Sequence, residues 1–356
     1  MTRMFVPGPV DVADDVLQAM AKPMLPHRSK DFEEIFQRAA KKAETLFYTQ
    51  YRVFLGTHSG SGMQEAGIRN FVNQDVLCLV NGAFSKRWFD VAVSNGKRAD
   101  RLDAEWGKPN DLQQLREALN AKHYEAVTIV HNETSTGVEN PLKAMCDVVH
   151  QTSPDTLILV DAVSSLGGVK VEMDAWGIDF LLTSSQKCLA LPPGLSLASA
   201  NDKAMKRAEN VANRGWYFDL LLMEKHRLKD STPMTPVIPL VYALDYQIDR
   251  MLKEGLEARF ARHAAMSQRV YAWCESHGMP ALAATDYRSK TVVTVKNELG
   301  WVIGDLNKFL LANYDLRIAN GYGELKDKTF RVATMGETDM LLVDKLLKGF
   351  EAFMAK

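Results

Sequence analysis

The stretch Thr156-Leu157-Ile158-Leu159-Val160-Asp161 decides the fold. Its uninterrupted apolar run is typical of a strand buried on both faces of a parallel sheet. The run ends in the carboxylate of Asp161. Amphipathic helical patterns, such as residues 111–121 and 142–151, separate several further runs of the same kind. These runs are residues 52–55, 76–80, 126–130 and 180–183. Short apolar strands alternating with helices predict an α/β domain whose mostly parallel sheet is covered by helices on both faces.

The pattern changes after Gly194. Residues 213–236 are predicted to be irregular, and long helical stretches follow at 237–253 and 256–276. A smaller α+β unit comes next, with strands expected near 291–296 and 329–334 and helices near 302–313 and 337–355. We therefore predict an N-terminal segment (1–15), a large domain (16–250) and a small C-terminal domain (251–356).

Composition excludes several classes of protein. The 356 residues carry 43 basic and 44 acidic side chains, and 46% are hydrophobic, which are ordinary values for a soluble globular protein and exclude a disordered, collagen-like or disulfide-framed chain. The near-zero net charge argues against a nucleic-acid partner, and the absence of a long apolar run argues against a membrane partner. The N-terminus lacks the apolar stretch of a signal peptide, so we expect a cytoplasmic protein. The four scattered cysteines predict buried free thiols, and no metal site is expected.

Polar residues follow the predicted strands where each strand ends. Asp161 ends one strand, and Ser184-Ser185-Gln186-Lys187 follows the next. The turn Gly56-Thr57-His58-Ser59-Gly60-Ser61-Gly62 precedes a helical pattern, and His131-Asn132-Glu133-Thr134 follows another strand. Because ligands bind at the carboxyl ends of parallel strands, we expect these groups to meet at one edge of the sheet.

Each group has an ordinary interpretation of its own. The glycine-serine turn suits a phosphate, but it also suits a plain strand-to-helix connection, and Glu65 stands where a dinucleotide fingerprint needs its third glycine. Lys187 is a nucleophilic amine or a solvated strand end, and Asp161 is a functional carboxylate or a cap. A phosphate turn, a lysine for a Schiff base and a carboxylate for a pyridine nitrogen together indicate pyridoxal 5'-phosphate.

Seven stretches then show a resemblance that covers nearly the whole chain. They are residues 7–10, 23–29, 59–66, 133–138, 160–168, 185–194 and 235–237. The sequence resembles the class V aminotransferases of fold type I, in the alanine–glyoxylate and serine–pyruvate branch. This resemblance implies a large pyridoxal-phosphate domain, a small α+β domain, and a homodimer with shared active sites.

The resemblance also implies a role for each matching residue. Lys187 carries the cofactor and moves the substrate proton, Asp161 binds the pyridine nitrogen, and Arg331 pairs with the substrate α-carboxylate. The other cofactor-binding residues that it implies are Ser59, Gly60, Ser61 and Gln186 at the phosphate, Thr235 reaching that phosphate from the neighbouring subunit, Phe84 stacked on the ring, Thr134 at the ring hydroxyl, and Val163.

Two departures and several functions remain open. His58 stands where many relatives have glycine, and Cys188 directly follows the lysine; the roles of His27 and Arg28 are undecided. We expect transfer of an amino group from alanine or serine to glyoxylate or pyruvate in two half-reactions. The alternatives are aspartate, phosphoserine or 2-aminoethylphosphonate as donor, a lyase of the desulfurase or kynureninase type, and a non-catalytic relative.

Overall fold

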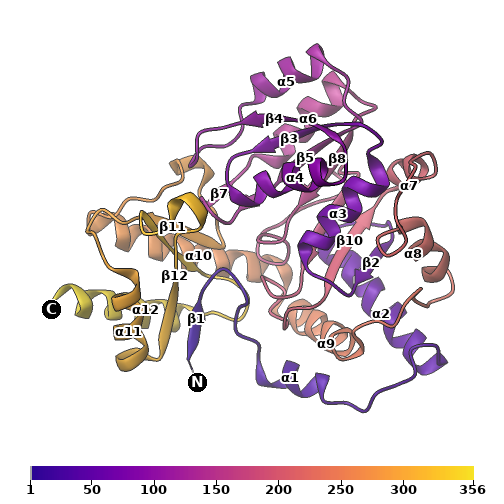
Figure 1. Cartoon of the computed structure of the whole chain (residues 1–356). Helices are drawn as coiled ribbons and strands as arrows, with labels where there is room; N and C mark the ends of the chain where they lie inside the picture. The colour runs from indigo at the N-terminus through magenta and orange to yellow at the C-terminus, as the bar shows by residue number, and fades with distance from the viewer. Residues whose placement is uncertain (1) are drawn as a thin grey trace.

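The computed structural model describes residues 2–356 and contains two main sheets (Figure 1). The larger sheet has a hydrophobic core on each face, and the smaller sheet has a core of its own. The larger sheet consists of β2 (Val53–Gly56), β3 (Asp75–Val80), β4 (Arg98–Asp103), β5 (Ala126–Val130), β8 (Leu157–Asp161), β9 (Phe180–Ser184) and β10 (Ser196–Ala200). Its strand order is β2-β10-β9-β8-β5-β3-β4. Only β10 runs antiparallel to its neighbours, so the predicted mostly parallel sheet is confirmed.

Helices cover both faces of this sheet because its central strands are apolar on both sides. Ile158 and Val160 point into one core and Leu157 and Leu159 into the other, which is the two-residue period of a strand. The first core is closed by α1 (Asp14–Met20), α2 (Lys30–Phe47), α5 (Leu112–Ala121), α6 (Leu142–Thr152) and α9 (Ile238–Glu254). The second core is closed by α3 (Gly60–Phe71), α4 (Ala83–Ser94), α7 (Asp202–Ala208) and α8 (Leu220–Arg227).

The smaller sheet combines the N-terminal strand with three strands from the end of the chain. They are β1 (Arg3–Phe5), β11 (Val292–Lys296), β12 (Leu316–Asn320) and β13 (Thr329–Ala333), in the order β1-β12-β13-β11. Its core is shared with α10 (Leu256–Ser276), α11 (Ile303–Tyr314) and α12 (Met340–Met354). The remaining short elements are the hairpin β6 (Asn132–Glu133) and β7 (Val138–Glu139) and the 3-10 turns η1 (Thr285–Tyr287) and η2 (Gly323–Leu325).

The structure corrects one prediction and adds several elements. Residues 213–236 are not irregular throughout, because α8 forms there and the Asp219 carboxylate caps it by accepting from the N–H groups of Leu221 and Leu222. The sequence pattern did not reveal β1, β4, β10 or β12; β10 in particular has small residues at four of its five positions and is buried between two neighbouring strands. The domain limits at residues 15 and 250 stay predictions.

The cysteines and the helices bear on two further expectations. All four cysteines are free and buried, as predicted. Within residues 2–356, none of the helices has both the length and the apolar character that crossing a membrane requires.

Candidate active site

Asp161 is the last residue of β8, at the carboxyl edge of the large sheet. One carboxylate oxygen accepts from the Val163 N–H at 2.8 Å, and the other accepts from Gln64 Nε2 at 2.7 Å. Burial raises the pKa of Asp161 to about 6, although the Val163 N–H holds it lower than burial alone would. Asp161 is therefore an oriented carboxylate that is mainly ionised at neutral pH.

Lys187 follows β9, the neighbour of β8, and its side chain is buried. Its Nζ donates to the carbonyl oxygen of Pro7, and Gly8 lies so close that a Cβ there would stand 2.7 Å from Lys187 Cδ. Burial, followed by the positive charge of Arg331, lowers the pKa of Lys187 to about 8. A lysine held in this way has an appreciable unprotonated fraction near neutral pH, as a nucleophilic amine requires.

The glycine-serine turn leads into the N-terminus of α3. Ser59 occupies the N-cap position but makes no side-chain capping hydrogen bond, so it leaves the first N–H groups of the helix for another acceptor. A Cβ on Gly60 would lie 2.8 Å from Val163 Cγ2, so the turn packs closely against the end of β8. Gln186 reaches the same corner, where its Oε1 accepts from Ser184 Oγ at 2.5 Å. Free N–H groups at the positive end of a helix fit a phosphate.

Phe84 stands in the first turn of α4, and the buried carboxylate of Glu133 places it there. Glu133 accepts from the Phe84 N–H at 3.1 Å and from the Ser85 N–H at 2.8 Å, so it caps the helix. The next residue, Thr134, shares a 2.6 Å hydrogen bond with Ser164. The Glu133 carboxylate thus fixes the backbone that carries Phe84, and Ser164 fixes the hydroxyl of Thr134.

These groups surround one cavity of about 210 Å³. Nine of the predicted residues line it: Ser59, Gly60, Ser61, Phe84, Thr134, Asp161, Val163, Gln186 and Lys187. Arg331 lies beside it, buried in β13, and donates to the carbonyls of Asn320 at 3.0 Å and Thr134 at 3.5 Å. Burial lowers the pKa of the Arg331 guanidinium to about 10. These groups fit pyridoxal phosphate, because an amine, a carboxylate and a helix N-terminus surround one cavity.

Thr235 does not join this set within its own chain. Its side chain is exposed, and it does not line the cavity. The segment that carries it is fastened nearby, because the Val237 N–H donates to Thr57 Oγ1 at 3.1 Å. His27 and Arg28, whose roles the sequence left undecided, are also absent from the cavity lining.

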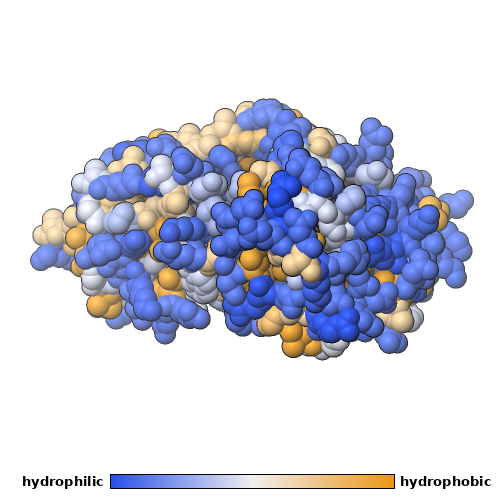
Figure 2. Space-filling model, turned by 90° about the horizontal axis from the view of Figure 1, so that it is seen from above, coloured by the Kyte–Doolittle hydropathy of each residue, from blue (hydrophilic) through white to orange (hydrophobic). Residues whose placement is uncertain are grey.

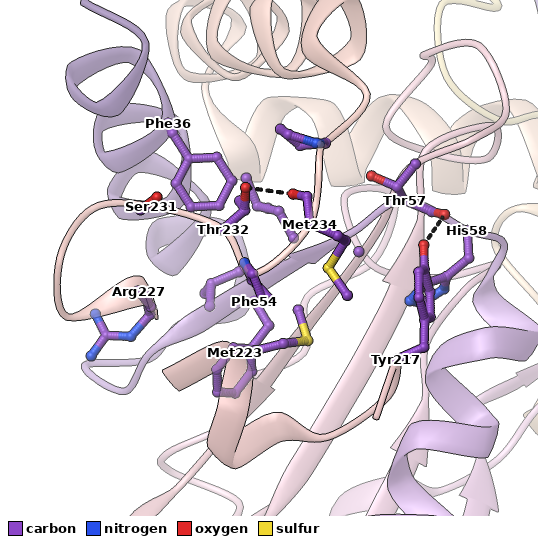
Figure 3. A pocket seen from close by; sticks show the side chains of 15 residues that line it. Phe36, Phe54, Thr57, His58, Tyr217, Met223, Arg227, Ser231, Thr232 and Met234 are labelled. Atoms are coloured by element: carbon purple, nitrogen blue, oxygen red, sulfur yellow. Dashed lines mark hydrogen bonds between the residues drawn. The ribbon is translucent and has the colours of Figure 1, made fainter. Parts of the chain in front are cut away.

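His58 lies behind the turn and does not enter the cavity. Its ring occupies the space beside Gly56 and Gly62, where a Cβ on either glycine would overlap with it. Its Nδ1 lies 2.9 Å from Ser196 Oγ, and Tyr217 stands next to it in Figure 3. Burial lowers the pKa of His58. This departure from the family pattern therefore leaves the phosphate side of the turn open.

Sequence reasoning missed four cavity residues: Gln64, Arg87, Val130 and Asn132. Gln64 follows Gly60 by four residues and so lies one helical turn further along the same face, a spacing that could have indicated it. Arg87 follows Phe84 by three residues on α4 and donates to Ser61 Oγ at 3.1 Å. Both residues contact a predicted site residue, Gln64 through Asp161 and Arg87 through Ser61.

Known proteins are similar to this chain in sequence and in fold. The family model for aminotransferase class-V matches residues 17–321. An uncharacterized aminotransferase of Methanocaldococcus jannaschii is 37% identical over 338 residues, which cover 94% of this chain and 87% of the relative. The L-aspartate–glyoxylate aminotransferase of Paracoccus denitrificans is 31% identical, with 94% and 86% covered. The crystal structure of alanine–glyoxylate aminotransferase from Nostoc sp. matches with a TM-score of 0.93 at 30% identity, covering 99% of this chain and 96% of that one.

The chain belongs to the class V aminotransferases, which are pyridoxal-phosphate enzymes of fold type I. The predicted family, enzyme class and cofactor are therefore confirmed. The relatives named above differ in their amino donor, aspartate in one and alanine in another, while glyoxylate is named for both.

Proposed function

We propose that this aminotransferase takes an amino group from a small amino acid, alanine or serine, and delivers it to a small 2-oxo acid, glyoxylate or pyruvate. The observation that carries the proposal is the buried Arg331 guanidinium beside the cavity. Within residues 2–356 it has no acidic side chain within salt-bridge distance, and its two observed acceptors are neutral carbonyls. An arginine held in this way is prepared for a carboxylate from outside the chain.

The bound cofactor supplies an electron sink that lets the substrate α-carbon lose its proton. Lys187 carries the cofactor and moves that proton through Nζ. Its lowered pKa suits the task, because an amine that titrates near 8 both accepts and releases a proton at neutral pH. The Pro7 carbonyl, which accepts from Nζ, holds the amine at the cavity.

Asp161 and the turn at residues 59–61 hold the two ends of the cofactor. The Asp161 carboxylate would bind the pyridine nitrogen, and its charge would favour the protonated ring. The turn and Gln186 would hold the phosphate, and Phe84 would stack on the ring. Thr134 and Val163 would complete the contacts near the end of β8.

The test is a donor screen on the cofactor-loaded protein. Each amino acid is added alone, without an acceptor, and transfer of its amino group is followed through the absorbance of the bound cofactor. L-Alanine and L-serine should react, and L-aspartate should react at least about tenfold more slowly. D-Alanine is the matched control, because it has the same groups with the opposite hand. Aspartate as the fastest donor would contradict the proposal.

The accessibility of the thiols weighs against the desulfurase alternative. That chemistry needs a reactive thiolate, and such thiolates lie in partly exposed surroundings. All four cysteines are buried, and burial raises the pKa of Cys78, Cys146, Cys188 and Cys274 to about 12.

Free thiols also suit a reducing compartment, which supports a cytoplasmic location; cell fractionation tests it.

We further propose a homodimer in which Thr235 contacts the phosphate bound by the partner subunit. Thr235 is exposed on a segment fastened next to the phosphate turn, and this region also exposes Trp216 by 64% and Leu228 by 70%. Figure 2 shows hydrophobic patches on a mostly hydrophilic face of the chain. Large exposed apolar side chains are characteristic of surfaces that pair with a partner.

The dimer is tested by mixing two variants, Thr235→Ala and Lys187→Ala. Thr235→Ala alone should bind pyridoxal phosphate roughly ten- to a hundredfold more weakly, since it removes a hydrogen bond to a charged acceptor. If the site is shared, one site of each heterodimer carries both changes and the other carries neither. Activity at low cofactor concentration should then exceed that of either parent. No recovery, or a fully active monomer by ultracentrifugation, would refute the shared site.

A further inference from the structure

Tyr322 reaches from the small sheet to the large one at the edge of the active site. It lies between β12 and η2, and its ring stacks on Phe84 with 5.1 Å between centroids and 27° between planes. Its hydroxyl accepts from Arg87 Nη2 at 3.4 Å, and the Arg331 Cζ lies 5.5 Å from its ring centroid. The Tyr322 side chain thus contacts the ring of Phe84 and both guanidinium groups, and Arg87 also lies against Phe84, with its Cζ 4.8 Å from the ring centroid.

The loop that carries Tyr322 is braced. The Gly321 N–H donates to the Thr329 carbonyl at 2.9 Å and to Asn320 Oδ1 at 2.7 Å. Asn320 also donates to Asp327 across the loop at 2.6 Å. A Cβ on Gly321 would overlap with the Leu325 carbonyl, so the turn is closed tightly on itself. The loop backbone is therefore held in place, and Tyr322 stands at the edge of the site, where it contacts the cavity-lining residues Phe84 and Arg87.

The two guanidinium groups that contact Tyr322, those of Arg87 and Arg331, lack acidic partners. Within residues 2–356, neither Arg87 nor Arg331 has a carboxylate within 4.0 Å. Arg331 donates from Nε and Nη1 to carbonyl oxygens, and its remaining N–H groups are available for another acceptor. Arg87 donates to two hydroxyls, those of Ser61 and Tyr322. Two cationic side chains thus lie at the site, and Tyr322 contacts both of them.

We propose that Tyr322 determines which amino donors this enzyme accepts, by restricting the site to donors with small, uncharged side chains. The inference rests on the proposed role of Arg331 at the substrate α-carboxylate. A methyl or hydroxymethyl side chain fits beside the ring. A donor with a second carboxylate can pair with Arg87 only after the ring and its hydroxyl give up their place.

The test measures binding of two unreactive probes, propionate and succinate, to the cofactor-loaded protein by calorimetry. Propionate presents one carboxylate, and succinate presents a second at the distance found in aspartate. Wild type should prefer propionate. Tyr322→Ala should bind succinate about tenfold more tightly than wild type does, because one new charge-assisted pair forms. Its affinity for propionate should change by less than about threefold. Tyr246→Ala is the matched control, since both tyrosines are 38% exposed.

Two further variants separate the ring from the hydroxyl and from Arg87. Tyr322→Phe keeps the ring and frees Arg87, so its preference should lie between wild type and Tyr322→Ala. The double variant Tyr322→Ala with Arg87→Gln should lose the gain in succinate affinity. An unchanged succinate-to-propionate ratio in Tyr322→Ala, or a gain that survives in the double variant, would overturn the proposal.

The probe measurement and the donor screen can fail separately. If alanine and serine fail as donors but another small, uncharged amino acid reacts and the probe ratio shifts in Tyr322→Ala, the proposed donors are wrong and the role of Tyr322 stands. Aspartate as the fastest donor would overturn both proposals. If both donors react and the ratio does not shift, the role of Tyr322 is wrong and the proposed function stands.

Discussion

The two sheets contribute to the active site in different ways. The large sheet offers Asp161 and Lys187 at the carboxyl ends of adjacent strands, each held by contacts to its immediate surroundings. The small sheet offers Arg331 from the middle of β13 and Tyr322 from a braced loop. The groups proposed for the cofactor therefore come mainly from one sheet, and those proposed for substrate choice come from the other.

A buried arginine holds the two parts in register. Arg259 of α10 donates to the carbonyls of Gly167 at 3.0 Å and Cys188 at 2.9 Å, and it pairs with Glu337, which follows β13. Cys188 is the neighbour of Lys187, so the contact joins the small sheet to the chain segment of the reactive lysine. On the proposed roles, a substitution in the small sheet would change donor choice while the contacts of Asp161 in the large sheet stay in place.

The largest effect should come from Lys187→Ala. Turnover should fall by at least about 1,000-fold, because both the covalent hold on the cofactor and the proton carrier are lost. Circular dichroism should report an intact fold, and Lys203→Ala, a lysine on α7, is the control. Near-normal turnover would remove the large sheet from the chemistry.

Asp161→Asn should come next, with a loss of about 100-fold in kcat. The amide keeps the shape of the carboxylate but not its charge, so the ring nitrogen is less readily protonated. Steady-state kinetics and the cofactor dissociation rate measure the effect, and Asp147→Asn on α6 is the control. An unaffected rate would mean that Asp161 only shapes the cavity.

Arg331→Gln examines the coupling between the sheets. The KM for the donor should rise roughly 30-fold, since a charge-assisted pair is lost. The pKa of Lys187 should also rise above 8, because a positive charge that lowers it is gone. Cofactor attachment to the unloaded protein requires the unprotonated amine, so its pH midpoint should move upward. An unmoved midpoint would show that the small sheet does not act on Lys187.

The smallest effect is expected from Gln64→Met, which removes one donor from the Asp161 carboxylate. The anion loses a hydrogen bond, so the pKa of Asp161 should rise above 6. The rate should then fall a few-fold at pH 6 and recover at pH 8, where the carboxylate is ionised again. An NMR titration of the carboxyl in the unloaded protein measures the shift directly. The same pKa in both proteins would contradict this role for Gln64.

The sequence was most informative where one rule links pattern to place. Asp161 and Lys187 were predictable because parallel strands bring their carboxyl ends to one edge. No comparable rule indicates Tyr322, whose position depends on how a loop of the small sheet meets α4. Gln64 was missed because its contact to Asp161 spans 97 residues and only the packed helix creates it. Similarly, β10 has only one large apolar residue, Leu197, and pairs with a strand on each side.

The position of His58 has a consequence for how this family can diverge. The ring fills space that exists only because Gly56 and Gly62 carry no side chain. An alanine at either glycine is incompatible with the histidine, whereas a glycine at position 58 removes that obstacle and leaves only the flexible end of Met63 close to position 56. The three positions should therefore covary among homologues, with substitutions at 56 or 62 confined to lineages that lack the histidine. While position 58 is histidine, positions 56 and 62 must stay glycine. A substitution at either glycine therefore requires a prior substitution of His58.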